Sequence, residues 1–218
     1  MVTLRLAIFV HPSWANNKTT PDRNEILNRQ LATADRWLQK HASIDLEWEF
    51  IPTQATEWDS VYLLDISEPH FFDSHDTTLI KEKTPGGYVP IVLTNHLFRY
   101  GQGKNNSPKP SKDSLRGLYA SNARLVVYTP SMGQTPLSID SKPLRGMWEL
   151  LHEIVHYIMD GGDDLGDSAY TDRNIMHGQS WAFGETDETE PAPSSQLRLA
   201  LRAFAIQLNQ DYEEEQRQ

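Results

Sequence analysis

The sequence predicts a single α/β domain, in which a mixed, twisted sheet of about five strands combines with three main helices. Residues 4–10 are rich in Leu, Ile, Phe and Val and precede a helical pattern, as expected for a buried strand that leads into a helix. Apolar and acidic side chains alternate strictly over residues 44–50, and a repeat of two residues is typical of a strand with one solvated face. Apolar residues also recur at helical spacing over residues 144–158 and 197–208.

The first helix is expected to begin at residues 20–22 and to run to about Lys40. Thr20 can cap it, Pro21 suits its first turn, and Asp22 complements the positive end of the helix dipole. Its apolar stripe consists of Ile26, Leu27, Leu31, Ala34 and Leu38.

Further strands are expected at residues 61–66 and 88–94. Pro90 lacks an N–H group, so it should lie near the beginning of its strand or at a sheet edge. Polar composition predicts a long loop over residues 67–87 and a mobile surface loop over residues 101–114.

Residues 118–120 and 124–129 are expected to form a hairpin through Ser121 and Asn122. The central helix should follow and begin near residues 141–143, with Ser141 as a candidate cap. The side chains that it is expected to bury are Leu144, Met147, Leu151, Val155 and Ile158.

The last helix is expected after the proline-rich stretch that begins at Pro191, and residues 211–218 should form a frayed tail. Its buried face would consist of Leu197, Leu201, Phe204 and Leu208. No internal repeat is present, and a length of 218 residues suits one domain over residues 1–218.

Composition excludes several classes of function. The net charge of −10 and pI near 5.2 disfavour nucleic acid and anionic membranes as partners. Cysteine is absent, which rules out disulfides, thiolate metal sites and a cysteine nucleophile. No apolar run is long enough to cross a membrane. No signal peptide is visible at the N-terminus, so a cytoplasmic location is favoured, and secretion is the alternative if a signal peptide was removed from the sequence.

The central helix carries His152, Glu153 and His156 in H-E-x-x-H spacing. Residues four apart lie one above the other on a helix, so both imidazoles can bind one cation, and they form half of a zinc site. Glu153 can reach a metal-bound water and accept its proton without binding the metal itself. The alternative is an amphipathic helix with two partly buried, hydrogen-bonded histidines.

The predicted element order, together with two motifs, resembles the metzincin zinc proteases. Beyond the H-E-x-x-H helix, the stretch Asn174, Ile175, Met176, His177 looks like the Met-turn of that family, in which a methionine lies beneath the metal. The resemblance implies an α+β fold of the zincin type and places Met176 in the turn. Met176 is otherwise expected to pack in an ordinary core.

The third metal ligand departs from the family pattern H-E-x-x-H-x-x-G-x-x-H, because Met159 stands in place of the glycine and Gly162 in place of the histidine. If Gly161 acts as the turn glycine, Asp164 falls at the offset of the family's third ligand. Aspartate suits zinc, and some metzincin-like proteases use it. Asp164 is therefore the expected ligand and Asp163 the alternative, unless both are solvated turn residues.

Other candidates for the third ligand are weaker. Asp160, if helical, would lie about 12 Å along the axis from His152, too far to share one ion. Asp167 and His177 are two further candidates for this ligand. His11, His70, His75 and His96 show no partner spacing and are expected to be structural or exposed.

These residues predict a zinc-dependent metallopeptidase that acts on a protein or peptide substrate. The resemblance implies that an extended substrate pairs with an edge strand, here Leu118, Tyr119 and Ala120. Tyr170 or His177 are candidates to stabilise the oxyanion.

Two alternatives stay open. One is a different zincin in which a downstream glutamate, Glu185, is the third ligand. The other is a non-catalytic binding module on a zincin-like scaffold, although such a module has no use for a general base at Glu153.

Overall fold

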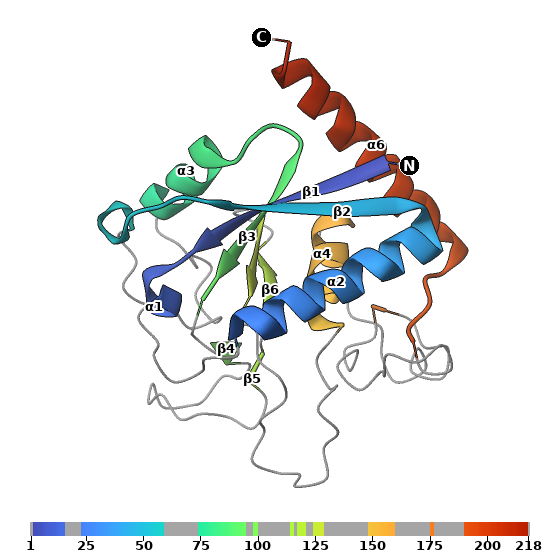
Figure 1. The fold of residues 1–218 in the computed structure, drawn as a ribbon, viewed down its shortest axis with the longest axis horizontal. Helices are drawn as coiled ribbons and strands as arrows, with labels where there is room; N and C mark the ends of the chain where they lie inside the picture. Colours follow the sequence, from blue (N-terminus) through green and yellow to red (C-terminus); the bar gives the residue numbers. More distant parts are fainter. Residues whose placement is uncertain are drawn as a thin grey trace, which may run out of the picture.

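The computed structural model describes residues 2–15, 23–58, 74–94, 98–99, 114–115, 117–120, 124–128, 148–159, 175–176 and 190–217. The strands are β1 (Val2–Val10), β2 (Ile44–Ile51), β3 (Tyr88–Leu93), β4 (Phe98–Arg99), β5 (Ser114–Leu115), β6 (Gly117–Ala120) and β7 (Leu125–Tyr128). The helices are α1 (Pro12–Ala15), α2 (Arg23–Ala42), the 3-10 turn η1 (Ala55–Glu57), α3 (Ser74–Lys83), α4 (Glu149–Ile158) and α6 (Ser195–Glu215). Figure 1 shows their arrangement.

The main sheet has the strand order β2-β1-β3-β7-β6. The first four strands run parallel, and β6 pairs antiparallel with β7, so the sheet is mixed. Strands β4 and β5 form a separate antiparallel pair. The mixed α/β architecture predicted from the sequence is confirmed, while the strand expected at residues 61–66 lies outside the described residues.

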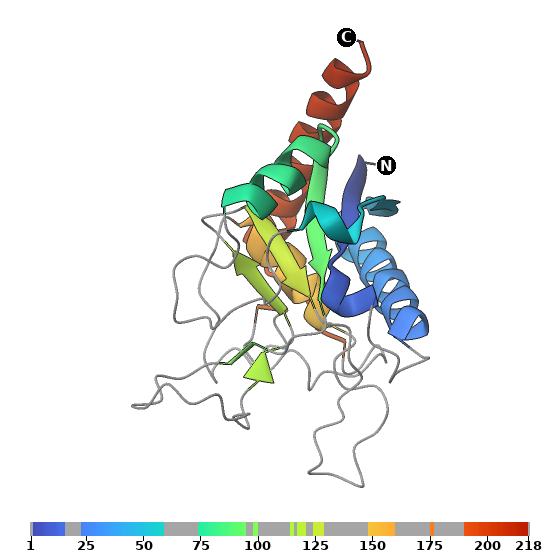
Figure 2. The same ribbon diagram turned by 90° about the vertical axis from the view of Figure 1, so that its left-hand side faces the viewer.

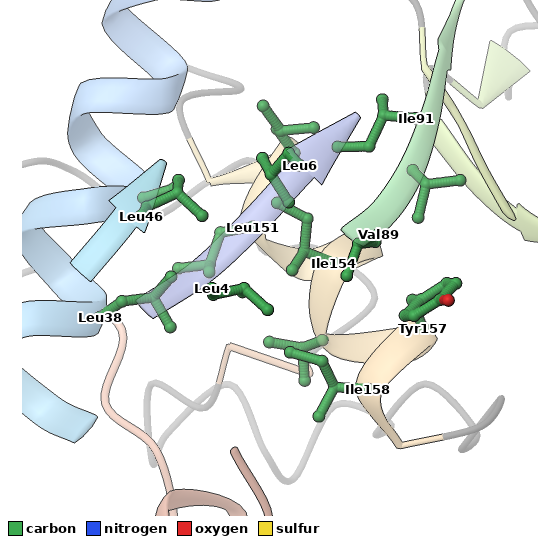
Figure 3. Close-up of a cluster of buried hydrophobic side chains, with 14 of the residues drawn as sticks. Leu4, Leu6, Leu38, Leu46, Val89, Ile91, Leu151, Ile154, Tyr157 and Ile158 are labelled. Atoms are coloured by element: carbon green, nitrogen blue, oxygen red, sulfur yellow. The ribbon is translucent and has the colours of Figure 1, made fainter. Parts of the chain in front are cut away.

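Helices α2, α4 and α6 cover one face of the sheet. The side chains that β1 sends to this face are Leu4, Leu6 and Ile8, which belong to the larger core cluster. Figure 3 shows Leu151, Ile154 and Ile158 of α4 in the same cluster as Leu4 and Leu6. Because side chains alternate along a strand, every second residue of β1, β3 and β7 contributes to this core.

The opposite face carries a smaller core formed with α3 and the end of η1. Its members are Ala7, Phe9, Trp58, Ile80, Val92, Leu125 and Val127. Figure 2 shows α2 and α3 on opposite sides of the sheet. The inner strands β1, β3 and β7 are therefore buried on both faces, which explains their near-continuous apolar sequences.

The prediction of a loop over residues 67–87 is wrong, because α3 occupies Ser74–Lys83. Asp76 in the first turn and Lys81 and Lys83 in the last turn complement the helix dipole. Ile80 is the one apolar residue of α3 that is fully buried in the core. The helical spacing of apolar residues in this segment is therefore too weak to detect in the sequence.

The central helix begins later than expected, at Glu149, with Trp148 at its N-cap. Among the described residues no side chain caps this end, and the N–H of His152 donates to the carbonyl of Trp148 at 2.9 Å. Trp148 is fully buried, so packing holds the start of the helix, while the candidate cap Ser141 lies outside the described residues. Residues 129–147 lie outside the described residues.

The tail predicted to fray from residue 211 is instead helical to Glu215. The Tyr212 ring packs against the Tyr88 ring, and the Arg5 guanidinium lies 4.0 Å from the centre of the Tyr212 ring. The backbone N–H of Gly86 donates to the Glu215 carboxylate. These tertiary contacts stabilise turns that helix propensity alone would leave frayed.

Pro90 is the third residue of β3, and β3 lies between β1 and β7 instead of at an edge. Pairing with β7 starts only at Ile91, so the proline lies near the beginning of the strand as predicted. Strands β6 and β7 form the expected antiparallel pair, with Ala120 opposite Leu125. The surface loop predicted at 101–114 falls outside the described residues, except that Ser114 begins β5.

Across the described helices, none combines the length and apolar character that a membrane span requires.

Candidate metal centre

Helix α4 holds the H-E-x-x-H residues because its apolar stripe anchors it to the sheet. Leu151, Val155 and Ile158 are buried as predicted. These side chains fix the rotation of the helix about its axis, and the rotation in turn determines where the residues between them point. The site is thus built on a rigid, packed helix.

His152 is buried, and its ring orientation is set by a distant segment of the chain. Its Nδ1 atom lies 2.7 Å from the backbone carbonyl oxygen of Ile175. A carbonyl oxygen can only accept a hydrogen bond, so Nδ1 carries the proton and donates it. In the neutral form of the ring, the Nε2 atom then presents a lone pair, as a metal ligand must.

His156 brings a second ring nitrogen to the same point. The Nε2 atoms of His152 and His156 lie 3.0 Å apart, with ring centroids 4.5 Å apart and planes at 85°. Two nitrogens bound tetrahedrally at typical zinc distances lie roughly 3.3 Å apart, so a small adjustment would let both bind one ion. Without metal, an N–H···N hydrogen bond from His156 Nε2 would satisfy the same contact.

Glu153 follows His152 on the helix and is partly exposed, whereas His152 is buried. Successive helical residues point about 100° apart, so Glu153 leaves the helix beside His152 and His156 instead of in line with them. A carboxylate with this access to solvent can exchange protons with water.

Ile175 and Met176 form a turn that is buried against α4. Both residues belong to the larger core cluster, and the Ile175 carbonyl accepts the bond from His152. Met176 therefore lies in the segment that supports the first histidine and is also part of the core. Its predicted position beneath a metal stays a prediction.

Strand β6 lies at one edge of the sheet and beside α4. The rings of Tyr119 on β6 and Tyr157 on α4 meet edge-to-face with centroids 5.6 Å apart, and Tyr157 also contacts Phe204 of α6. This stack connects the motif helix to the strand that contains Leu118, Tyr119 and Ala120. The predicted substrate strand is thus the edge strand next to the motif helix.

The expected third ligand lies outside the residues that the structure describes. This is true of Asp164 and of its alternatives Asp163, Asp167, His177 and Glu185, and also of the oxyanion candidate Tyr170. Over the described part of the chain, no three His, Cys, Asp or Glu side chains gather so as to hold a metal.

Of the four histidines without partner spacing, the two that are described agree with expectation. His11 is buried with its ring 5.0 Å from the Trp58 ring, and His75 is exposed. His70 and His96 lie outside the described residues. Sequence reasoning missed the role of the Ile175 carbonyl, because a backbone oxygen carries no signal in the residue type.

No family model and no curated protein sequence matches this chain. The fold is similar to archaemetzincin from Methanopyrus kandleri, with a TM-score of 0.47 and 15% identity over 94% of this chain and 96% of that one. It is also similar to metalloproteinase-II from Bacteroides fragilis, with a TM-score of 0.49 and 12% identity. That match covers 93% of this chain but 53% of the other, so this chain spans about half of its length.

Proposed function

We propose that the chain is a zinc-dependent metallopeptidase of the metzincin-like type. The proposal rests on the geometry of the histidine pair. The Nε2 atoms of His152 and His156 lie 3.0 Å apart, and the Ile175 carbonyl sets the tautomer of His152. A histidine ligand whose other ring nitrogen donates to a carbonyl is the usual arrangement around protein-bound zinc.

The donor chemistry of this centre suits zinc. Imidazole nitrogens with a carboxylate form a common catalytic zinc shell, and the chain has no cysteine that would favour a closed structural site. His152 and His156 would hold the ion together with Asp164, or with Asp163 as the alternative. Such a three-residue shell leaves one position open, which a catalytic site requires and a structural site does not.

The residues of the helix would divide the work of hydrolysis. Bound zinc would supply a Lewis acid that polarises a scissile carbonyl and increases the acidity of water. Glu153 would accept a proton from the attacking water and deliver it to the leaving amine. The Ile175 carbonyl would keep His152 in the binding tautomer, and β6 would pair with an extended substrate.

The test compares wild type with Glu153→Gln in two assays, zinc content and cleavage of a denatured protein. The variant should keep its zinc and lose about 10²- to 10⁴-fold in kcat/KM, the range for a general base. Glu82→Gln, an exposed acid on α3, is the matched control and should behave as wild type. Full activity in Glu153→Gln would refute the mechanism.

A second experiment separates the ligand sets. Zinc content is measured for Asp164→Ala, Asp163→Ala and Glu185→Ala. Loss of zinc in Asp164→Ala or Asp163→Ala supports the proposed shell, whereas loss only in Glu185→Ala supports the other zincin arrangement. A wild-type protein that binds zinc but cleaves no peptide would be a binding module instead.

A further inference from the structure

We infer that the outer edge of β2, over residues 47–51, is a docking site for an extended protein segment in which basic and apolar side chains alternate. Strand β2 lies at the end of the sheet opposite to β6, so this site is separate from the proposed substrate edge. The inference therefore holds whether or not the proposed peptidase function is correct.

The backbone of β2 offers hydrogen-bonding groups on its outer side. The N–H of Leu46 donates to Asp35 Oδ1 of α2 at 2.9 Å, so α2 covers the edge at this point. N–H groups alternate in direction along a strand, so those of Trp48 and Phe50 point the same way, away from β1. Within the described ranges, β2 pairs with β1 alone, and no backbone bond joins Trp48 or Phe50 to a further strand.

The two faces of this edge differ in chemistry. Trp48 and Phe50 point to the face that bears α2 but stay 37% and 52% exposed, which is high for large aromatic residues on a strand. Asp45, Glu47 and Glu49 point to the other face. Glu47 forms an ion pair with Arg5 at 3.4 Å and remains mostly exposed.

The alternation of aromatic and acidic side chains along β2 indicates which segment would bind there. A strand added to this edge would place alternate side chains beside the aromatic pair and beside the carboxylates, so apolar and basic residues should alternate in the partner. The net charge of −10 also favours the approach of a basic segment.

A second copy of the chain does not fit this edge. Two copies paired antiparallel about a two-fold axis would place Glu47 and Glu49 among the same carboxylates of the other copy, and like charges opposite each other destabilise a sheet. Residues 44–51 contain no Lys, Pro or bulge of the kind that protects other edges. The acidic row therefore opposes self-pairing but leaves the edge open to a basic strand.

The test uses the full chain and a short blocked peptide in which lysine and valine alternate. Binding is measured by titration calorimetry, and hydrogen exchange locates the site. The peptide should bind and slow amide exchange at Trp48 and Phe50. Binding should weaken about tenfold or more in Glu49→Lys, while Glu82→Lys, the matched charge reversal on α3, should bind as wild type.

Two altered peptides separate strand pairing from charge attraction. N-methylation of alternate backbone nitrogens removes the donors on one peptide edge and should abolish binding, and so should a shuffled sequence that groups the lysines together. Equal affinity for these peptides would overturn the inference, as would protection at Leu118–Ala120 instead of β2. Sedimentation that shows a dimer dissociated by Phe50→Thr would assign the edge to a second copy and also overturn it.

Discussion

Replacement of Leu151 by Ala should destabilise the protein strongly, because this side chain packs the motif helix onto the sheet. Leu151 is fully buried in the larger core and precedes His152 in sequence. Figure 3 shows it in the same cluster of buried side chains as Leu4 of β1. A fully buried leucine truncated to alanine costs about 3–5 kcal/mol in transfer and cavity free energy. For a chain of this size, each kcal/mol lowers Tm by about 2–4 °C, so the expected decrease is about 6–20 °C.

The assay is urea and thermal unfolding followed by circular dichroism, with chelator present so that metal binding does not add to stability. Leu199→Ala is the matched control, since Leu199 on α6 is 70% exposed and its loss should change stability by less than about 0.5 kcal/mol. A cost below about 1 kcal/mol for Leu151→Ala would show that α4 is not anchored through this side chain, and the placement of His152 argued from it would be wrong.

Three further changes test other parts of the structure. Ser194→Ala should cost about 1 kcal/mol in urea unfolding, because the Ser194 hydroxyl accepts the N–H of Leu197 at the start of α6. The pKa of Glu57 is lowered, first by the hydrogen bond from the backbone N–H of Gln54 and then by Lys83. The stabilisation that the Glu57 carboxylate contributes is therefore complete above the ordinary glutamate pKa and is lost as the pH falls through the lowered value. Glu57→Gln should reduce this decrease in stability at acid pH, measured as the free energy of unfolding against pH. Zinc at 100 times its Kd should raise the free energy of unfolding by about 2.7 kcal/mol in calorimetry, and an unchanged Tm would contradict specific binding to the native state.

The periodic elements were predictable because their signals are local. The alternation over residues 44–50 and the apolar run over residues 4–10 located β2 and β1, and the stripe that contains Leu197 and Leu201 located α6. Helix α3 and the last turns of α6 were missed because each depends on contacts with a distant segment. Trp48 and Phe50 were expected on a strand, but no pattern showed that they would stay exposed at its edge.

The sequence by itself determined the spacing of His152, Glu153 and His156, since four-residue spacing on a helix places two side chains on one face. It also determined the order of strand and helix along most of the described chain. Only the tertiary structure decided that the Ile175 carbonyl, 23 residues along the chain, accepts the hydrogen bond from His152 Nδ1, so that the Nε2 lone pair of His152 faces His156. That contact requires the turn at Ile175 to pack against α4, and packing between distant segments depends on the whole core instead of on any local pattern.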